Sequence, residues 1–169
     1  MRMKPQSSSE DISIRPAGEQ DVGAILQFIR DLAHYEHLEH EVVATEESLR
    51  EALFGSRPYA EVVLACLRGE PVGFALFFHN FSTFLGRAGI YLEDLYVRPE
   101  TRGHGVGRRL LTWLAATAVS RGCGRVEWAV LDWNEPSIQF YRKLGAVAKD
   151  KWTTYRLTGP ALDRLAREG

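Results

Sequence analysis

The sequence predicts an α/β fold in which a mixed β-sheet carries helices on both faces. Two strand-like runs, AEVVLACL and PVGFALFFH, are joined by the short segment RGEP, which is typical of a β-hairpin. A third run, GIYLEDLYV, precedes a helical pattern and then RVEWAVL, an order typical of a strand–helix–strand crossover. Hairpins and crossovers together favour a sheet with antiparallel and parallel pairs over a purely parallel one.

The N-terminal part of the chain predicts one strand and two helices. Residues 12–16 alternate like a short strand and stop at a proline. Thr45 is expected to cap a second helix that ends at Gly55. The first helix is expected over residues 19–36, because its apolar residues recur at helical spacing: Val22, Ile25, Leu26, Ile29, Leu32 and Ala33.

The C-terminal part predicts alternating helices and strands. The segment NEPSIQFYRKLG is expected to form a helix between strands at residues 125–131 and 152–159. The helix after the third strand should span residues 107–121 and bury Leu110, Leu111, Leu114 and Ala118. A short C-terminal helix should place Leu162, Leu165 and Ala166 on its inner side.

Length and composition predict one soluble globular domain. The 169 residues are 45% hydrophobic and 25% charged, and we expect a disordered leader at residues 1–11 before a single domain over residues 12–169. A net charge of −1 gives no support to a nucleic-acid or membrane surface. Cys66 and Cys123 lack metal-ligand spacing, and no apolar run could cross a bilayer. We therefore expect a cytoplasmic protein without a metal.

A glycine-rich segment, RPETRGHGVGRRLL, opens the helix that follows the third strand. Exposed amides at a helix start favour an anion, and four arginines accompany one acid, Glu100, between residues 98 and 109. The spacing fits neither the dinucleotide fingerprint nor the phosphate loop of nucleotide triphosphatases. It predicts a pyrophosphate site, and the alternative is a tight turn with solvated arginines.

The glycine-rich segment and several other motifs resemble those of a known family. Arg102-x-x-Gly105-x-Gly107 after YLEDLYV resembles the acetyl-CoA site of the GNAT N-acetyltransferases. IRPA, LAHYEHLEHEVVATEE, RGHGVG and DWNEPSIQFYRKLGA extend the likeness to the spermidine/spermine (diamine) N-acetyltransferase branch, over residues 12–158. The resemblance implies the GNAT acyl-CoA N-acyltransferase fold, acetyl-CoA as cosubstrate and a homodimer.

The resemblance also implies two catalytic residues. Glu93 would be the general base, acting through an ordered water, and Tyr141 the general acid that protonates the leaving thiolate. Strand alternation predicts that Glu93 shares a face with Tyr91 and Leu95, with Asp94 on the other face. A solvated carboxylate at Glu93 and a core tyrosine at Tyr141 are the alternatives.

The resemblance assigns the remaining site residues to the two ligands. Asn134 is expected both to cap its helix and to contact the pantetheine arm. The residues expected at acetyl-CoA are Leu95, Tyr96, Val97, Arg102, Gly103, His104, Gly105, Val106, Gly107, Arg108, Asn134, Pro136, Ser137 and Tyr141. Those expected at the amine are Tyr35, Glu36, Glu93, Asp94 and Trp128.

Charge distribution favours a small cationic amine as the acceptor. Seven acids lie between residues 31 and 51 with Arg50 as the one formal base, although a solvated helix face gives the same pattern. By the resemblance, Glu36 would bind a distal ammonium. The branch carries acids where this chain has Lys149, Lys151 and Trp152, so a short diamine or a lysine analogue such as thialysine is credible beside a polyamine. A protein lysine or an antibiotic amine as acceptor, and a non-catalytic acyl-CoA sensor, are the alternatives.

Overall fold

The computed structural model describes residues 12–168 and divides after Ala129 into two compact units. The first unit contains the β-sheet and three α-helices, and the second contains two further helices. The leader expected at residues 1–11 lies outside the described residues, and the single domain expected over residues 12–169 stays a prediction. Within the described part of the chain, no helix is long and apolar enough to span a bilayer.

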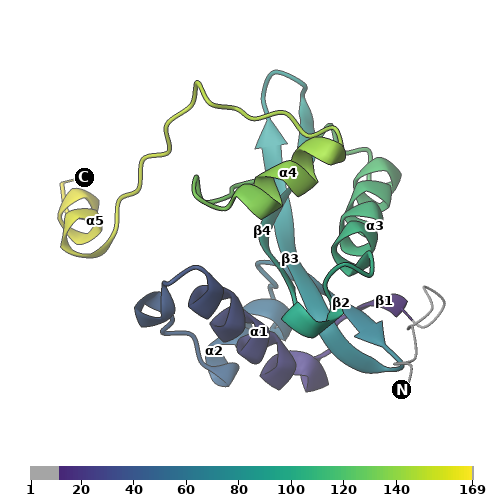
Figure 1. Cartoon of the computed structure of the whole chain (residues 1–169). Helices are drawn as coiled ribbons and strands as arrows, with labels where there is room; N and C mark the ends of the chain where they lie inside the picture. Colours follow the sequence, from purple (N-terminus) through teal and green to yellow (C-terminus); the bar gives the residue numbers. More distant parts are fainter. Residues whose placement is uncertain (1–11, 169) are drawn as a thin grey trace, which may run out of the picture. The chain divides into compact units, whose positions relative to one another are not determined.

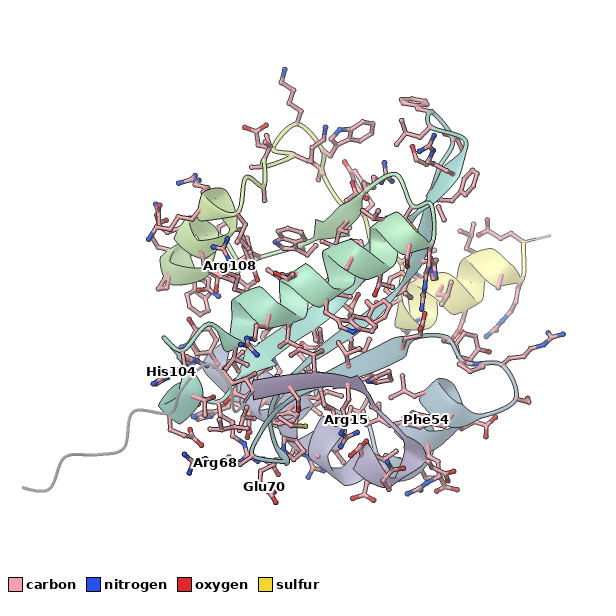
Figure 2. The ribbon with its side chains drawn as sticks, turned by 90° about the vertical axis from the view of Figure 1, so that its right-hand side faces the viewer. Arg15, Phe54, Arg68, Glu70, His104 and Arg108 are labelled. Carbon is pink, nitrogen blue, oxygen red and sulfur yellow. The ribbon has the colours of Figure 1, made fainter. Side chains whose placement is uncertain are left out.

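The sheet of the first unit is mixed, as the sequence predicts. Its order is β1-β2-β3-β4-β5, and the first three pairs are antiparallel while β4 and β5 are parallel. The strands are β1 (Ile12–Pro16), β2 (Glu61–Leu67), β3 (Glu70–Ser82), β4 (Arg87–Val97) and β5 (Val126–Trp128). The β2–β3 hairpin turns through Arg68 and Gly69, which both have positive φ angles, and Figure 2 labels Arg68 and Glu70 at this turn.

Helices cover both faces of this sheet, which confirms the expected architecture. Figure 1 shows α1 (Val22–Tyr35) and α2 (Glu46–Phe54) on one side of the strands and α3 (Val106–Ser120) on the other. Thr45 caps α2 through the Ser48 amide, as expected, and α2 ends at Gly55. The core beneath α1 and α2 contains Ile25, Phe28, Leu53, Val62, Leu64, Cys66, Phe74 and Tyr96.

A partly buried ion pair fixes the start of α1 on β1. The helix expected over residues 19–36 begins as a 3-10 turn at Glu19–Asp21. Arg15 in β1 donates two hydrogen bonds to the Asp21 carboxylate, at 2.7 and 2.9 Å, and the Gly18 amide donates a third. These hydrogen bonds lower the pKa of Asp21, so this carboxylate stays charged beside the core. The position of the helix along the sheet is thereby set from its first turn.

The second unit contains α4 (Glu135–Lys143) and α5 (Gly159–Ala166). The strand expected at residues 152–159 is wrong: residues 152–158 form no strand, and Trp152 and Tyr155 are exposed. A strand propensity reflects packing against neighbouring strands, and no described strand pairs with this segment. Leu162 and Leu165 of α5 are also exposed rather than buried.

The strand expected at residues 125–131 is shorter than predicted. β5 spans three residues, which pair with Ile90, Tyr91 and Leu92 of β4. The parallel ladder ends at Leu92, and immediately after this residue β4 changes its register with β3. This change of register also creates the candidate site.

Candidate active site

β4 contains a β-bulge at Glu93. Asp94 pairs with Leu76 of β3, whereas Leu92 pairs with the next residue, Phe77, so Glu93 is the additional residue of β4. The predicted alternation through this residue is therefore wrong. Tyr91 packs against the Phe78 ring at 5.3 Å, on the face of α1 and α2, while Leu95 lies opposite Ala75 on the face of α3. The bulge inverts the faces of β4 midway, because one unpaired residue shifts the pleat by one step.

The bulge also leaves one edge of β4 open. The Arg98 amide donates to the Val72 carbonyl of β3 at 2.9 Å, and amides two residues apart on a strand point to the same edge. The amides of Leu95 and Val97, which have the other parity, therefore point away from β3. Beyond the pairing of Leu92 with Trp128, no strand of the described chain bonds to that edge. Trp128 is half-buried at this last position of β5. The amides of Leu95 and Val97 thus lie on an open edge of β4, and the contact with acetyl-CoA expected of them stays a prediction.

Acidic side chains gather beside the bulge. Burial, followed by the charges of Glu93 and Glu36, raises the pKa of Asp94 to about 6. Glu36 follows α1 directly, and burial raises the pKa of this carboxyl as well. Glu93 is exposed, whereas Asp94 and Glu36 are half-buried. Carboxyl groups from two separate elements thus lie close enough to repel one another, which is costly unless a cation binds between them.

Other acids of the 31–51 segment have different partners. His34 contacts Glu39 at 2.6 Å, and Arg50 pairs with Glu46 and with Glu19. Glu46 and Glu47 lie in the first turn of α2, where the helix dipole favours negative charge. The alternative of a solvated helix face thus describes the α2 acids well, and Glu36 differs from them by its burial beside β4.

An arginine connects the end of α1 to the end of β4. The Arg102 guanidinium lies 5.0 Å from the ring centroid of Tyr35 and 5.6 Å from that of Tyr96. Its Nε donates to the Val97 carbonyl at 2.8 Å. Tyr96 is buried, and its ring lies 6.1 Å from the Phe28 ring of α1. Tyr35 and Glu36, both expected at the amine, therefore lie beside the loop that was expected to bind the cofactor.

The glycine loop has the backbone that the sequence pattern predicts. Gly103 and Gly105 have φ angles of 79° and 81°, a region that favours glycine, and nothing lies within 4 Å of a Cβ added at either position. Gly105 is the N-cap of α3 and provides no side-chain cap, so the first amides, at Val106 and Gly107, can meet an external acceptor.

The basic residues of the loop do not share one role. Figure 2 labels His104 and Arg108 at the N-terminal end of α3, where both are exposed. The His104 ring is 3.0 Å from the Arg102 carbonyl. Arg109 instead donates to the Ile12 carbonyl, which ties α3 to β1. Arg108 is thus the arginine of this turn best placed for an anion, and Arg109 contributes to the fold.

The second unit positions Asn134 and Tyr141 on α4. Asn134 is buried, and its Oδ1 accepts a hydrogen bond from the Ser137 amide, while Pro136 occupies the first turn. The Tyr141 ring lies 5.4 Å from the Phe140 ring and is half-buried. The capping role expected for Asn134 is confirmed. The ligand contacts expected for Asn134, Pro136, Ser137 and Tyr141 stay predictions.

The described residues contain no cluster of potential metal ligands. Within residues 12–168, no group of three or more His, Cys, Asp or Glu side chains could hold an ion. Cys66 is buried and Cys123 half-buried, and both are free thiols. The functional groups brought together in the first unit are therefore carboxylates, backbone amides and the loop arginines.

Comparisons with known proteins agree on one family. The acetyltransferase (GNAT) family matches residues 25–146. A thialysine N-epsilon-acetyltransferase of Bos taurus is 40% identical over 166 residues, which are 92% of this chain and 97% of that protein. The L-ornithine N5-acetyltransferase NATA1 of Arabidopsis thaliana is 34% identical, over 90% of this chain and 86% of that protein. The solved structure of an integron cassette protein from V. cholerae has a TM-score of 0.78 at 24% identity, over 93% of this chain and 98% of that one, and this likeness shows the fold.

Proposed function

The chain belongs to the acetyltransferase (GNAT) family, and from that premise we propose that it acetylates a small cationic amine. The acetyl group comes from acetyl-CoA, the cosubstrate of this family. The acceptor is the primary amine of a polyamine, a diamine or a lysine analogue such as thialysine. Transfer is direct, because neither cysteine of the chain lies among the proposed site residues.

The observation that carries this proposal is the approach of Glu36 to the acids of the β4 bulge. Glu36 comes from the end of α1 and Asp94 from β4, and their charges interact. A substrate with two ammonium groups would relieve this repulsion at one end while presenting an amine at the other. A neutral acceptor would leave the repulsion in place, so this arrangement favours an acceptor with a second ammonium group.

A lysine analogue is favoured within this class of amines. Two relatives are named for thialysine and for L-ornithine, which are amino acids that end in a primary amine. In both compounds the α-ammonium group supplies the second positive charge, next to the α-carboxylate. Lys149 and Lys151 stand where the polyamine branch has acids, which disfavours a long polycation.

The residues of this chain fit acetyl-CoA, which supplies the acetyl thioester when bound. The amides of Leu95 and Val97 point from an open strand edge and would hold the pantetheine arm, as strand edges hold extended ligands. The uncapped start of α3 and the exposed Arg108 would hold the pyrophosphate. Asn134 of α4 would contact the arm from its helix start.

The proposed chemistry needs one proton acceptor and one proton donor. An alkylammonium group titrates at about 10, so the amine must lose a proton before it can attack. Glu93, exposed at the bulge, would accept this proton through a water molecule. As the carbon–nitrogen bond forms and the carbon–sulfur bond breaks, Tyr141 would donate its phenolic proton to the departing sulfur.

Release of free thiol from acetyl-CoA tests the function directly. The purified protein is assayed with thialysine, ornithine, lysine, putrescine, spermidine and spermine, each against a reaction without amine. We expect the highest kcat/KM with thialysine or ornithine and the lowest with spermine. Thiol release that no amine accelerates would contradict the proposal and favour an acyl-CoA sensor.

Two further properties of the resemblance belong to this proposal. We expect a homodimer and a cytoplasmic enzyme that binds neither nucleic acid nor membrane. The net charge of −1 supports the expectation that the enzyme does not bind nucleic acid, because surfaces that bind nucleic acid require concentrated positive charge. Light scattering on the purified protein, with a mass twice that of the chain as the expected result, checks the oligomeric state.

A further inference from the structure

We propose that Arg102 is a positioning residue of the amine site, which holds Tyr35 through stacking, rather than a ligand of the cofactor phosphates. This inference rests on the proposed function and refines it. The sequence pattern alone groups Arg102 with the glycine loop, and hence with the cofactor. The contacts of the Arg102 side chain indicate a role at the amine instead.

The guanidinium of Arg102 is committed to groups of the protein. It lies over two aromatic rings, 5.0 Å from the Tyr35 centroid and 5.6 Å from the Tyr96 centroid. Its Nε donates to the Val97 carbonyl at 2.8 Å, and the Arg102 amide donates to the Pro99 carbonyl at 3.2 Å. An arginine that turned to a phosphate would give up both stacking contacts and leave the Val97 carbonyl without this donor.

The anchor of this arrangement is rigid. Tyr96 is buried, and its ring packs against Phe28, which is fully buried in the core under α1. Val97 is the last residue of β4, and its carbonyl fixes the direction of the guanidinium plane. The Arg102 guanidinium is thus held at the end of β4, and it also lies over the ring of Tyr35.

Tyr35 is the ring through which Arg102 acts on the proposed amine site. It is the last residue of α1, and directly after it Glu36 approaches Asp94. His37 follows with a φ angle of 60°, and the Leu38 amide bonds back to the Ala33 carbonyl, so the chain turns sharply at this point. Stacking on Arg102 fixes the ring next to this turn, and with it the path of the backbone that carries Glu36.

Charge supports the same role. Arg102 is a cation near the proposed amine site, whose substrate is also cationic. A mobile arginine there would compete with the ammonium for the acids, whereas contacts with two rings and the Val97 carbonyl hold the Arg102 guanidinium in place. Lysine would keep the charge but would lose the planar stacking on the rings and the Nε hydrogen bond to the Val97 carbonyl.

Steady-state kinetics distinguishes a role of Arg102 at the amine from a role at acetyl-CoA. Arg102→Met keeps most of the stem, and Arg102→Lys keeps the charge. KM is measured for thialysine and for acetyl-CoA, together with the dissociation constant of CoA by calorimetry and the melting temperature. We expect both variants to raise KM for the amine by about fivefold, the loss of one or two cation–π contacts at an exposed site. KM for acetyl-CoA and the CoA dissociation constant should change less than twofold.

Arg108→Met is the matched control, because Arg108 lies in the same loop and is exposed at the start of α3. It should show the opposite pattern, with weaker CoA binding and an unchanged KM for the amine. A double variant adds a second measurement. A general loss of structure would not make the effects of the two substitutions on KM non-additive. In a Tyr35→Leu background, Arg102→Met should raise KM for the amine no further, because the contact is already lost.

Three results would overturn the role of Arg102. The first is an Arg102→Lys protein with wild-type constants, which would show that charge alone suffices. The second is a rise in the acetyl-CoA constants that equals or exceeds the rise for the amine. The third is additive effects of the Arg102 and Tyr35 variants. A wild-type protein that acetylates no amine would overturn the proposed function and this inference together, whereas these three results leave the proposed function intact.

Discussion

Glu36 at the end of α1 lies close enough to Asp94 in β4 that its charge raises the pKa of the Asp94 carboxyl. Neither residue has a basic partner among the described contacts that would offset this repulsion. Folding thus brings together two acids that would be more stable apart. Such a cost is typical of a binding site that is completed by its ligand.

Asp94→Asn is expected to stabilise the protein at neutral pH. The pKa of Asp94 is 3.8 in the unfolded chain and about 6 in the folded one, so the folded state holds this proton more tightly. Stability from this group is complete below pH 3.8 and is lost as the pH rises to about 6. Above that pH the variant should gain about 1–2 kcal/mol, less than the full shift implies, because the side chain is only half-buried.

Urea unfolding at pH 4 and at pH 7.5 measures this difference. The gain should be present at pH 7.5 and should shrink at pH 4, where wild-type Asp94 is mostly protonated. Asp163→Asn, at an exposed position of α5, is the control and should change neither value. An equal gain at both pH values would show that the Asp94 charge is not the cause.

Glu36→Gln is expected to discriminate diamines from monoamines. The variant keeps the shape of the side chain but removes the charge that would bind the distal ammonium. KM for putrescine should rise roughly tenfold, the equivalent of about 1.4 kcal/mol, while KM for butylamine should change little. Glu47→Gln, an exposed acid of α2, is the matched control and should affect neither amine. Equal rises for both amines would contradict the role of Glu36 as the partner of a distal charge.

The sequence predicts most of the fold because local patterns agree with the tertiary structure in the first unit. The helical spacing of α1, the Thr45 cap and the RGEP hairpin each depend on neighbours in the chain, and each is confirmed. The strand expected at residues 152–159 fails for the opposite reason. Its β-branched and aromatic residues favour a strand only where a partner strand is available, and the sequence does not show whether one is.

The bulge at Glu93 could have been found in the sequence. The apolar residues of β4 that face α3 are Ile90, Leu92, Leu95 and Val97, with a step of three between the second and third. A step of three in a period of two is the signal of one additional residue. The electrostatic interaction of Glu36 with Asp94 and the stacking of Arg102 had no such signal, because they join segments that only the fold brings together.

Arg108→Ala is expected to weaken CoA without destabilising the protein. Arg108 is exposed beside the uncapped start of α3, where a pyrophosphate would compensate its charge. Affinity for CoA should fall about tenfold, and affinity for a pantetheine fragment without phosphates should not change. Calorimetric titration with both ligands checks this. Equal losses for CoA and the fragment would remove the pyrophosphate from the role of Arg108.

Arg109→Ala is the control for that experiment. Arg109 donates to the Ile12 carbonyl and so ties α3 to β1. Its loss should lower the free energy of unfolding by about 1–2 kcal/mol, because a charged donor to a backbone carbonyl is removed. The ratio of CoA to pantetheine affinity should stay as in the wild-type protein. A changed ratio would place Arg109 at the phosphates beside Arg108.

Tyr141→Phe tests the proposed general acid with the smallest available change. Removing one hydroxyl leaves the half-buried ring of α4 and its contact with Phe140 in place. Because a positioned proton donor contributes about 10²-fold or more, kcat should fall by that factor while the CoA dissociation constant stays unchanged. The loss should be larger with acetyl-CoA than with a thioester whose thiol has a low pKa, since that thiolate leaves without a proton. Tyr155→Phe, at a fully exposed tyrosine of the same unit, should keep full turnover. Equal losses with both thioesters would mean that Tyr141 positions the substrate and does not donate the proton.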